Sequence, residues 1–269
     1  MDRFVDTAAG RFQYLEWGAP DAPPLLLLHG FNQTAHSWVE FAEALGERYR
    51  VVAFTQRGHG DSLRADDYSR ETMVGDVDDV ATALGIERFG LVGMSMGAVH
   101  AISFTGAQAL RVKALVVVDY APAVKREGVT KISSVVSHRF ESFEVAVQQV
   151  MHFNPRRTED NIRQRLSHTL RQGDDGRWGW KVDVNIGKDK RFGEPAEVMW
   201  KQVAAIACPS LIIRGADSDL LEQEAAERMA RELGDGRLAV VTGAGHSVAG
   251  DNPEGFHAVA APFLDAHAG

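Results

Sequence analysis

Short apolar runs alternate along the chain with stretches in which apolar residues recur every three or four positions. The runs have the length of strands and few polar residues, as expected for strands covered on both faces. They are Leu25–Leu28, Val51–Phe54, Phe89–Val92, Ala114–Val118 and Leu211–Ile213. Helical spacing is clearest near the end of the chain, where Phe256, Val259 and Phe263 share one face. Strands that alternate with helices predict an α/β fold with a doubly wound, mostly parallel sheet.

The alternation stops between about Ala123 and Ala204. This segment is polar, with helical patterns over Val129–Met151 and Thr158–Leu170, then a loop-rich stretch, and it has no strand-like run longer than a few residues. We therefore predict a core of residues 1–122 and 205–269, with residues 123–204 inserted as a helical cap. An insertion of this length with no sheet of its own is more often functional than decorative, which favours a lid over an active site.

Composition and charge narrow the classes of partner. The chain has 269 residues, of which 45% are hydrophobic and 25% charged, as in ordinary globular proteins. Its net charge of −8 disfavours nucleic acid and membrane surfaces as partners. The first residues lack the basic and apolar regions of a secretory signal, and no apolar run reaches the length of a membrane span. We expect a cytoplasmic protein that acts on a small molecule; the pattern does not indicate its oligomeric state.

Cofactor and metal motifs are missing from the sequence. Cys208 is the single cysteine, which excludes an intrachain disulfide. Acidic pairs such as Asp66-Asp67 and Asp78-Asp79 have no clustered histidine or cysteine beside them, and we interpret them as solvated faces. The G-x-G-x-x-G pattern of dinucleotide enzymes is also absent. We therefore expect no metal and no cofactor.

The pattern G-x-S-x-G occurs at residues 93–97, with Ser95 at its centre. It follows the strand Phe89–Val92 and precedes the helical stretch Ala98–Ala109. A serine on such a turn has its hydroxyl exposed at the sheet edge, and flanking glycines let strand and helix approach. We interpret Ser95 as a nucleophile. The backbone N–H of Met96, at the start of the helix, is a candidate oxyanion donor.

Two further loops supply partners for such a serine. His29-Gly30-Phe31 follows the strand Leu25–Leu28, and the backbone N–H of Phe31 is the candidate second oxyanion donor. His246 lies in a glycine-rich loop after the strand Leu238–Val241, where a general base could reach across the top of the sheet. The remaining histidines fit surface, packing or substrate-contact positions better.

Together these motifs resemble the α/β-hydrolase superfamily along nearly the whole chain. They are HGF at 29–31, RGHGDS at 57–62, GMSMG at 93–97, RGADSDLL at 214–221 and GAGHSV at 243–248. The resemblance implies a serine, acid and histidine triad, with the insertion at the position of the family's cap. Its commonest acid position, three residues after Gly215, holds Ser218, flanked by Asp217 and Asp219.

A second acid candidate is Asp119, which ends the strand Ala114–Val118. It resembles the acid of a subgroup, including bacterial esterases and acetamidomethylene-succinate hydrolases, whose acid follows this earlier strand. We favour Asp119 as the residue that orients His246, with Asp217 or Asp219 as the alternatives. Candidate substrate-binding residues are Tyr120, Trp178, Trp180 and Trp200, although the tryptophans would also suit a core.

These features favour a cofactor-free serine hydrolase. Its substrate would be a small to medium carboxylic ester, or else a lactone or thioester, cleaved through an acyl-enzyme intermediate. One alternative is hydrolysis of a carbon–carbon or amide bond in a dienoate-like acid. Another, of a different class, is a ligand receptor that keeps the hydrolase shell. Epoxide hydrolases and haloalkane dehalogenases need a carboxylate where Ser95 stands.

Overall fold

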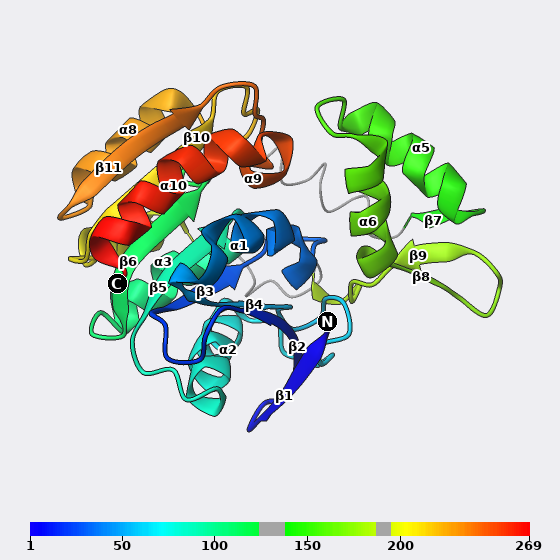
Figure 1. The fold of residues 1–269 in the computed structure, drawn as a ribbon, viewed down its shortest axis with the longest axis horizontal. Helices are drawn as coiled ribbons and strands as arrows, with labels where there is room; N and C mark the ends of the chain where they lie inside the picture. Colours follow the sequence, from blue (N-terminus) through cyan, green and yellow to red (C-terminus); the bar gives the residue numbers. More distant parts are fainter. Residues whose placement is uncertain (124–137, 187–194) are drawn as a thin grey trace.

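An eight-stranded sheet runs through the centre of the structure in the order β1-β2-β4-β3-β5-β6-β10-β11 (Figure 1). The computed structural model describes residues 1–123, 138–186 and 195–269. The strands are β1 (Arg3–Thr7), β2 (Gly10–Trp17), β3 (Pro24–Leu28), β4 (Arg50–Phe54), β5 (Phe89–Met94), β6 (Val112–Val118), β10 (Ser210–Gly215) and β11 (Gly236–Val241). All neighbours from β4 to β11 pair in parallel, which confirms the predicted doubly wound, mostly parallel sheet.

The first two strands have no counterpart among the predicted ones. β1 and β2 form an antiparallel hairpin, and β2 pairs antiparallel with β4. β1 lies at the edge of the sheet with most of its residues exposed, so its sequence, RFVDT, mixes charged and apolar residues. An edge strand of this kind does not produce the apolar run that marks a buried strand.

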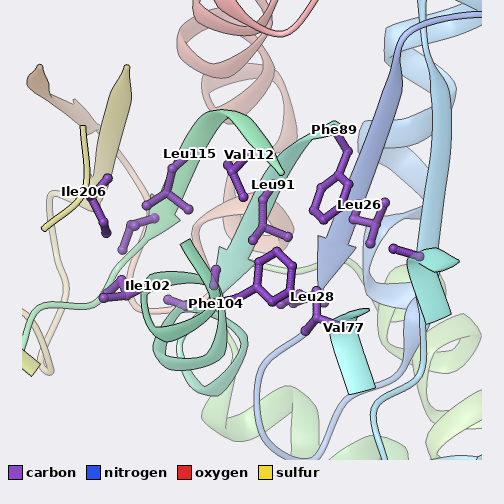
Figure 2. Close-up of a cluster of buried hydrophobic side chains, with 14 of the residues drawn as sticks. Leu26, Leu28, Val77, Phe89, Leu91, Ile102, Phe104, Val112, Leu115 and Ile206 are labelled. Carbon is purple, nitrogen blue, oxygen red and sulfur yellow. The ribbon is translucent and has the colours of Figure 1, made fainter. Parts of the chain in front are cut away.

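Helices cover both faces of the sheet, as the alternating pattern predicted. They are η1 (Ala35–Trp38), α1 (Val39–Leu45), η2 (Gly46–Arg48), α2 (Arg70–Ala83), α3 (Met96–Ala107), α8 (Gln223–Glu232), α9 (Val248–Asp251) and α10 (Pro253–His267). Successive residues of β3 point to opposite faces. Leu26 and Leu28 pack in the cluster beneath α2, α3 and α8, which Figure 2 shows around Phe89 and Phe104. Leu25 and Leu27 pack in the cluster beneath α1 and α10.

The inserted segment forms a lobe beside the sheet (Figure 1). It contains α5 (Phe143–Phe153) and α6 (Glu159–Thr169), and a three-stranded antiparallel sheet of β7 (Arg139–Phe140), β8 (Leu170–Gln172) and β9 (Trp178–Trp180). The expectation that this insertion has no sheet was wrong. Its strands have two or three residues and so make no apolar run; the glycine-rich stretch after Leu170 is the β8–β9 hairpin.

Two other parts of the expected insertion bear on its boundaries. The start of the predicted helix Val129–Met151 and the charged loop at 187–194 lie outside the described residues. α7 (Ala196–Ala204) buries Met199 and Val203 in the same cluster as α3 and α8, so this helix packs on the core. In the described parts of the chain, no helix combines the length and apolar character needed to cross a membrane.

Candidate active site

Ser95 lies on a strained turn between β5 and α3. Its backbone has φ 52° and ψ −114°, a conformation that non-glycine residues rarely adopt. Close contacts with the backbone leave no room for a side chain at the two glycines of this turn. A Cβ on Gly97 would lie 2.3 Å from the carbonyl oxygen of Leu28, and a Cβ on Gly93 would lie 2.3 Å from the carbonyl oxygen of Gly97. The turn therefore holds the Ser95 side chain at the carboxyl end of the sheet, half-buried.

His246 meets a carboxylate that comes from another strand. Its Nδ1 lies 2.8 Å from Oδ2 of Asp119, which is fully buried directly after β6. The backbone N–H of Gly215 donates to the other oxygen, Oδ1, at 3.0 Å. Asp119 also has a positive φ of 50°, so its direction is set by the backbone. A buried, doubly anchored carboxylate of this kind can fix the imidazole in one tautomer.

The flanking acids lie elsewhere. Asp217 is exposed and pairs with Arg156 of the cap at 3.0 Å, and Asp219 is exposed. The side chain between them, Ser218, points to the site: its hydroxyl donates to Oδ2 of Asp119 at 2.5 Å and accepts from the amide of Leu221 at 3.1 Å. This role of Ser218 was not predicted; the signal for it was a serine at the family's usual acid position.

Replacing Ser218 by alanine should therefore weaken catalysis without abolishing it. Asp119 would lose one charge-assisted hydrogen bond but keep the amide of Gly215. We expect kcat for an activated ester to fall about tenfold, with KM nearly unchanged. Steady-state kinetics measure this, and Ser218→Thr, which keeps the hydroxyl, should stay close to the wild type. Equal loss in both variants would show that the position matters for packing alone.

A chain of buried polar side chains connects the loop and the helix that carry the two oxyanion candidates. Gln56 donates from its side chain to the carbonyl of His29 at 2.7 Å, and its amide donates to Nε2 of that residue at 2.9 Å. On its other side, Oε1 of Gln56 lies 2.6 Å from Nδ1 of His100 on α3. The chain thus joins the loop of Phe31 to the helix that begins with Met96. Gln56 was not singled out from the sequence, because only its contacts distinguish it.

Burial keeps the histidines beneath these loops neutral. It lowers the pKa of His59 to about 4 and that of His100 to about 3, and moves the pKa of His29 well below its ordinary value. Each ring packs or hydrogen-bonds inside the core, with the rings of His29 and His59 5.1 Å apart. These residues act as structural supports for the site.

This burial has a consequence for stability against pH. Below the ordinary histidine pKa of about 6.5, the unfolded chain binds protons that the folded chain excludes. The free energy of unfolding should therefore have its full value above pH 6.5 and fall as the pH drops toward 4. The fall should be at most about 1.4 kcal/mol per pH unit for each such histidine. Urea unfolding at pH 7.5 and 5.5 measures it. His100→Asn, which keeps a donor for Gln56, should show a smaller fall in the free energy of unfolding between these two pH values. An unchanged fall would contradict the assignment of His100 as a buried, neutral histidine.

The candidate substrate-binding residues separate into different environments. Trp178 packs on Phe143 within the cap, with ring centroids 5.2 Å apart. Trp200 lies on α7 beneath Arg228, whose guanidinium is 3.9 Å from the ring centroid. Trp180 packs, like Phe31, against a small buried cluster of Tyr68, Val182 and Ile186. Its indole N–H is buried and has no hydrogen-bond partner among the described residues.

Tyr120, the fourth candidate, directly follows Asp119. It is half-buried and packs against the core cluster beneath α3, and burial raises its pKa to about 12. Its phenol is therefore neutral at ordinary pH. In the described residues, one group of side chains has a metal-ligating composition, and it is formed by Asp2, His36 and His168. None of these three belongs to the serine, histidine and acid set.

The chain belongs to the alpha/beta hydrolase family, whose model matches residues 25–259. It is 29% identical to esterase Rv0045c of Mycobacterium tuberculosis over 96% of this chain and 87% of that protein. It is 30% identical to the 3-hydroxybutyrate-oligomer hydrolase of Cupriavidus necator, over 82% of each chain. The structure of E-2-(acetamidomethylene)succinate hydrolase superposes with a TM-score of 0.88 at 23% identity, over 98% of this chain and 99% of that one.

These comparisons confirm the fold and the class. The chain is a hydrolase of the alpha/beta family, in an esterase-like subgroup, and ester hydrolysis is the activity of its relatives at the level of the family.

Proposed function

We propose that this chain hydrolyses small to medium carboxylic esters, with Ser95 as nucleophile, His246 as general base and Asp119 as the orienting acid. The observation that carries the proposal is the 2.8 Å contact between Nδ1 of His246 and the buried Asp119 carboxylate. It leaves Nε2 of the same ring for a proton from serine. The strained turn at Ser95 supports the same assignment, because backbone strain of this kind accompanies exposed nucleophiles.

The reaction then runs through an acyl-enzyme. His246 takes the Ser95 proton as the serine oxygen bonds to the ester carbonyl carbon, and the amides of Phe31 and Met96 stabilise the resulting oxyanion. His246 returns the proton to the leaving alkoxide, which departs and leaves Ser95 acylated. A water molecule deprotonated by His246 attacks the acyl carbon, and His246 returns that proton to the Ser95 oxygen as the bond to the acyl carbon breaks and the acid is released.

A panel of p-nitrophenyl esters from acetate to decanoate, with the matching thioesters and amides, tests the substrate class. Stopped-flow measurement should show a burst of p-nitrophenol that approaches one equivalent of enzyme where deacylation is slower than acylation. The carboxylic esters of short and medium chain should be the best substrates. A protein that binds these esters but never turns them over would instead be a receptor with the hydrolase shell. Faster cleavage of amides or thioesters would contradict the ester assignment.

Trp180 is our candidate for a wall of the acyl pocket. Both tryptophans pack against the cluster inside the cap, but Trp180 also contacts the small buried cluster that Phe31 contacts. Its indole N–H has no hydrogen-bond partner among the described residues, and these two features support this role for Trp180 over Trp178. We expect Trp180→Ala to change the ratio of kcat/KM between octanoyl and acetyl esters by about tenfold, because one apolar contact is worth that much discrimination. Trp178→Ala serves as the matched control. A uniform loss for every ester in both variants would show that Trp180 only stabilises the fold.

A further inference from the structure

A cluster of three metal-ligating side chains lies outside the hydrolytic site. Asp2 precedes β1, His36 lies in η1, and His168 lies near the end of α6 in the cap. One ring nitrogen of each histidine and one carboxylate oxygen of Asp2 lie within 4.8 Å of one another. They line a pocket of about 240 Å³. Its other walls include Leu15, Trp17, Val39 and Glu43.

We infer that Asp2, His36 and His168 form a binding site for a divalent late transition metal such as Zn²⁺, which would connect the cap to the core. A site made of two imidazoles and a carboxylate binds Zn²⁺ and similar transition metals in preference to Mg²⁺ or Ca²⁺. A further position stays open for water or for the carboxylate of Glu43, which lines the same pocket. Because α6 packs on η1, one ion here would join two segments far apart in the chain.

The hydrogen bonds of His36 suit it to this role. Its Nδ1 lies 3.3 Å from the hydroxyl of Thr34, and its Nε2 lies 3.0 Å from Oδ1 of Asp2. A metal that replaces the proton between Nε2 and the carboxylate would keep both residues as ligands, while Nδ1–H donates to Thr34. An outer partner that fixes the tautomer of a ligating histidine is the usual arrangement in metal sites.

His168 needs a small movement to complete the site. Its ring stacks on that of His36, with centroids 3.4 Å apart and 8° between the planes, so the nitrogen lone pairs of the two rings lie in nearly parallel planes. Ligand atoms around a tetrahedral Zn²⁺ are about 3.4 Å apart, less than the present upper limit of 4.8 Å. Rotation of the His168 side chain would turn its nitrogen toward the ion. The nearby Lys181 is paired with Asp61 at 2.8 Å, which offsets its charge.

Isothermal titration of the full chain with Zn²⁺, in a buffer that does not bind metals, tests the site. The wild type should bind Zn²⁺ here, and His36→Gln and His168→Gln should each weaken the affinity by more than about 100-fold. Loss of an outer partner of a ligand costs up to about 100-fold, and loss of a direct ligand should cost more. Asp2→Asn should also weaken it; this side chain is 40% exposed, so the change should leave folding intact. His152→Gln, at an exposed cap histidine on α5, is the matched control and should bind as the wild type does.

The same titration separates this site from the hydrolytic one, because His246 could also bind Zn²⁺. If His246→Gln abolishes binding while His168→Gln and Asp2→Asn leave it intact, the proposal is overturned. Hydrogen exchange supplies a second readout: Zn²⁺ should slow exchange of the α6 amides in the wild type but not in Asp2→Asn. Zn²⁺ binding without this protection would overturn the connection between cap and core.

Discussion

Ser95→Ala should remove hydrolysis of activated esters almost entirely, with kcat lower by roughly 10⁶. Alanine removes the oxygen that bonds to the acyl carbon and leaves the oxyanion donors in place. The same variant should not be labelled by a fluorophosphonate probe, because that reagent forms its covalent bond with the nucleophilic oxygen. Ester assays and gel-based labelling of the purified protein measure the two effects side by side.

Folding provides the control for this variant. The left-handed backbone at position 95 is held by the close packing of Gly97 against Leu28, and alanine fills no additional space. We expect circular dichroism and the melting temperature of Ser95→Ala to remain near those of the wild type. Labelling of the variant by one equivalent of probe would show that Ser95 is not the nucleophile. A large fall in melting temperature would leave the labelling test as the deciding one, performed below that temperature.

The sequence predicted the parts of the fold whose burial is complete. β3, β5 and β6 are covered by helices on both faces, so their apolar runs were visible without any contact information. The β7–β9 sheet and β1 were not predicted, because strands of two or three residues, and an edge strand that mixes charged and apolar residues as RFVDT does, carry no such run. A local sequence pattern indicates only strands that are long and buried, and these strands are short or exposed.

The candidate site was predictable to the extent that its residues occupy recurring motifs. Ser95 lies in a pattern with its own backbone requirement, and His246 in a glycine-rich loop that follows a strand. Ser218 and Gln56 were not predictable in the same way. A hydroxyl or an amide gains its role here from one partner on a distant strand or helix, Asp119 in one case and His100 in the other.

Asp119→Asn should lower kcat by about 10³–10⁴, because an asparagine amide can hold the imidazole in the wrong tautomer and cannot balance its positive charge. The same change at Asp217 or Asp219 should cost less than tenfold, since Asp217 is exposed and pairs with Arg156, and Asp219 is also exposed. Kinetics of the three asparagine variants on one activated ester measure this directly. If Asp217→Asn or Asp219→Asn instead lost most of its kcat while Asp119→Asn stayed near the wild type, the residue at 217 or 219 would be the orienting acid.

Position 218 allows a sharper form of this experiment. The Ser218 hydroxyl lies 2.5 Å from the Asp119 oxygen that meets His246, so a carboxylate at 218 would start close to the imidazole. We expect the double variant Asp119→Asn with Ser218→Asp to recover at least about tenfold of the lost kcat, since the orienting charge returns from the other strand. Ser218→Asp alone should lose activity, because two carboxylates would then share one buried site. A double variant no faster than Asp119→Asn, although folded, would show that only the backbone at Asp119 directs a carboxylate correctly onto His246.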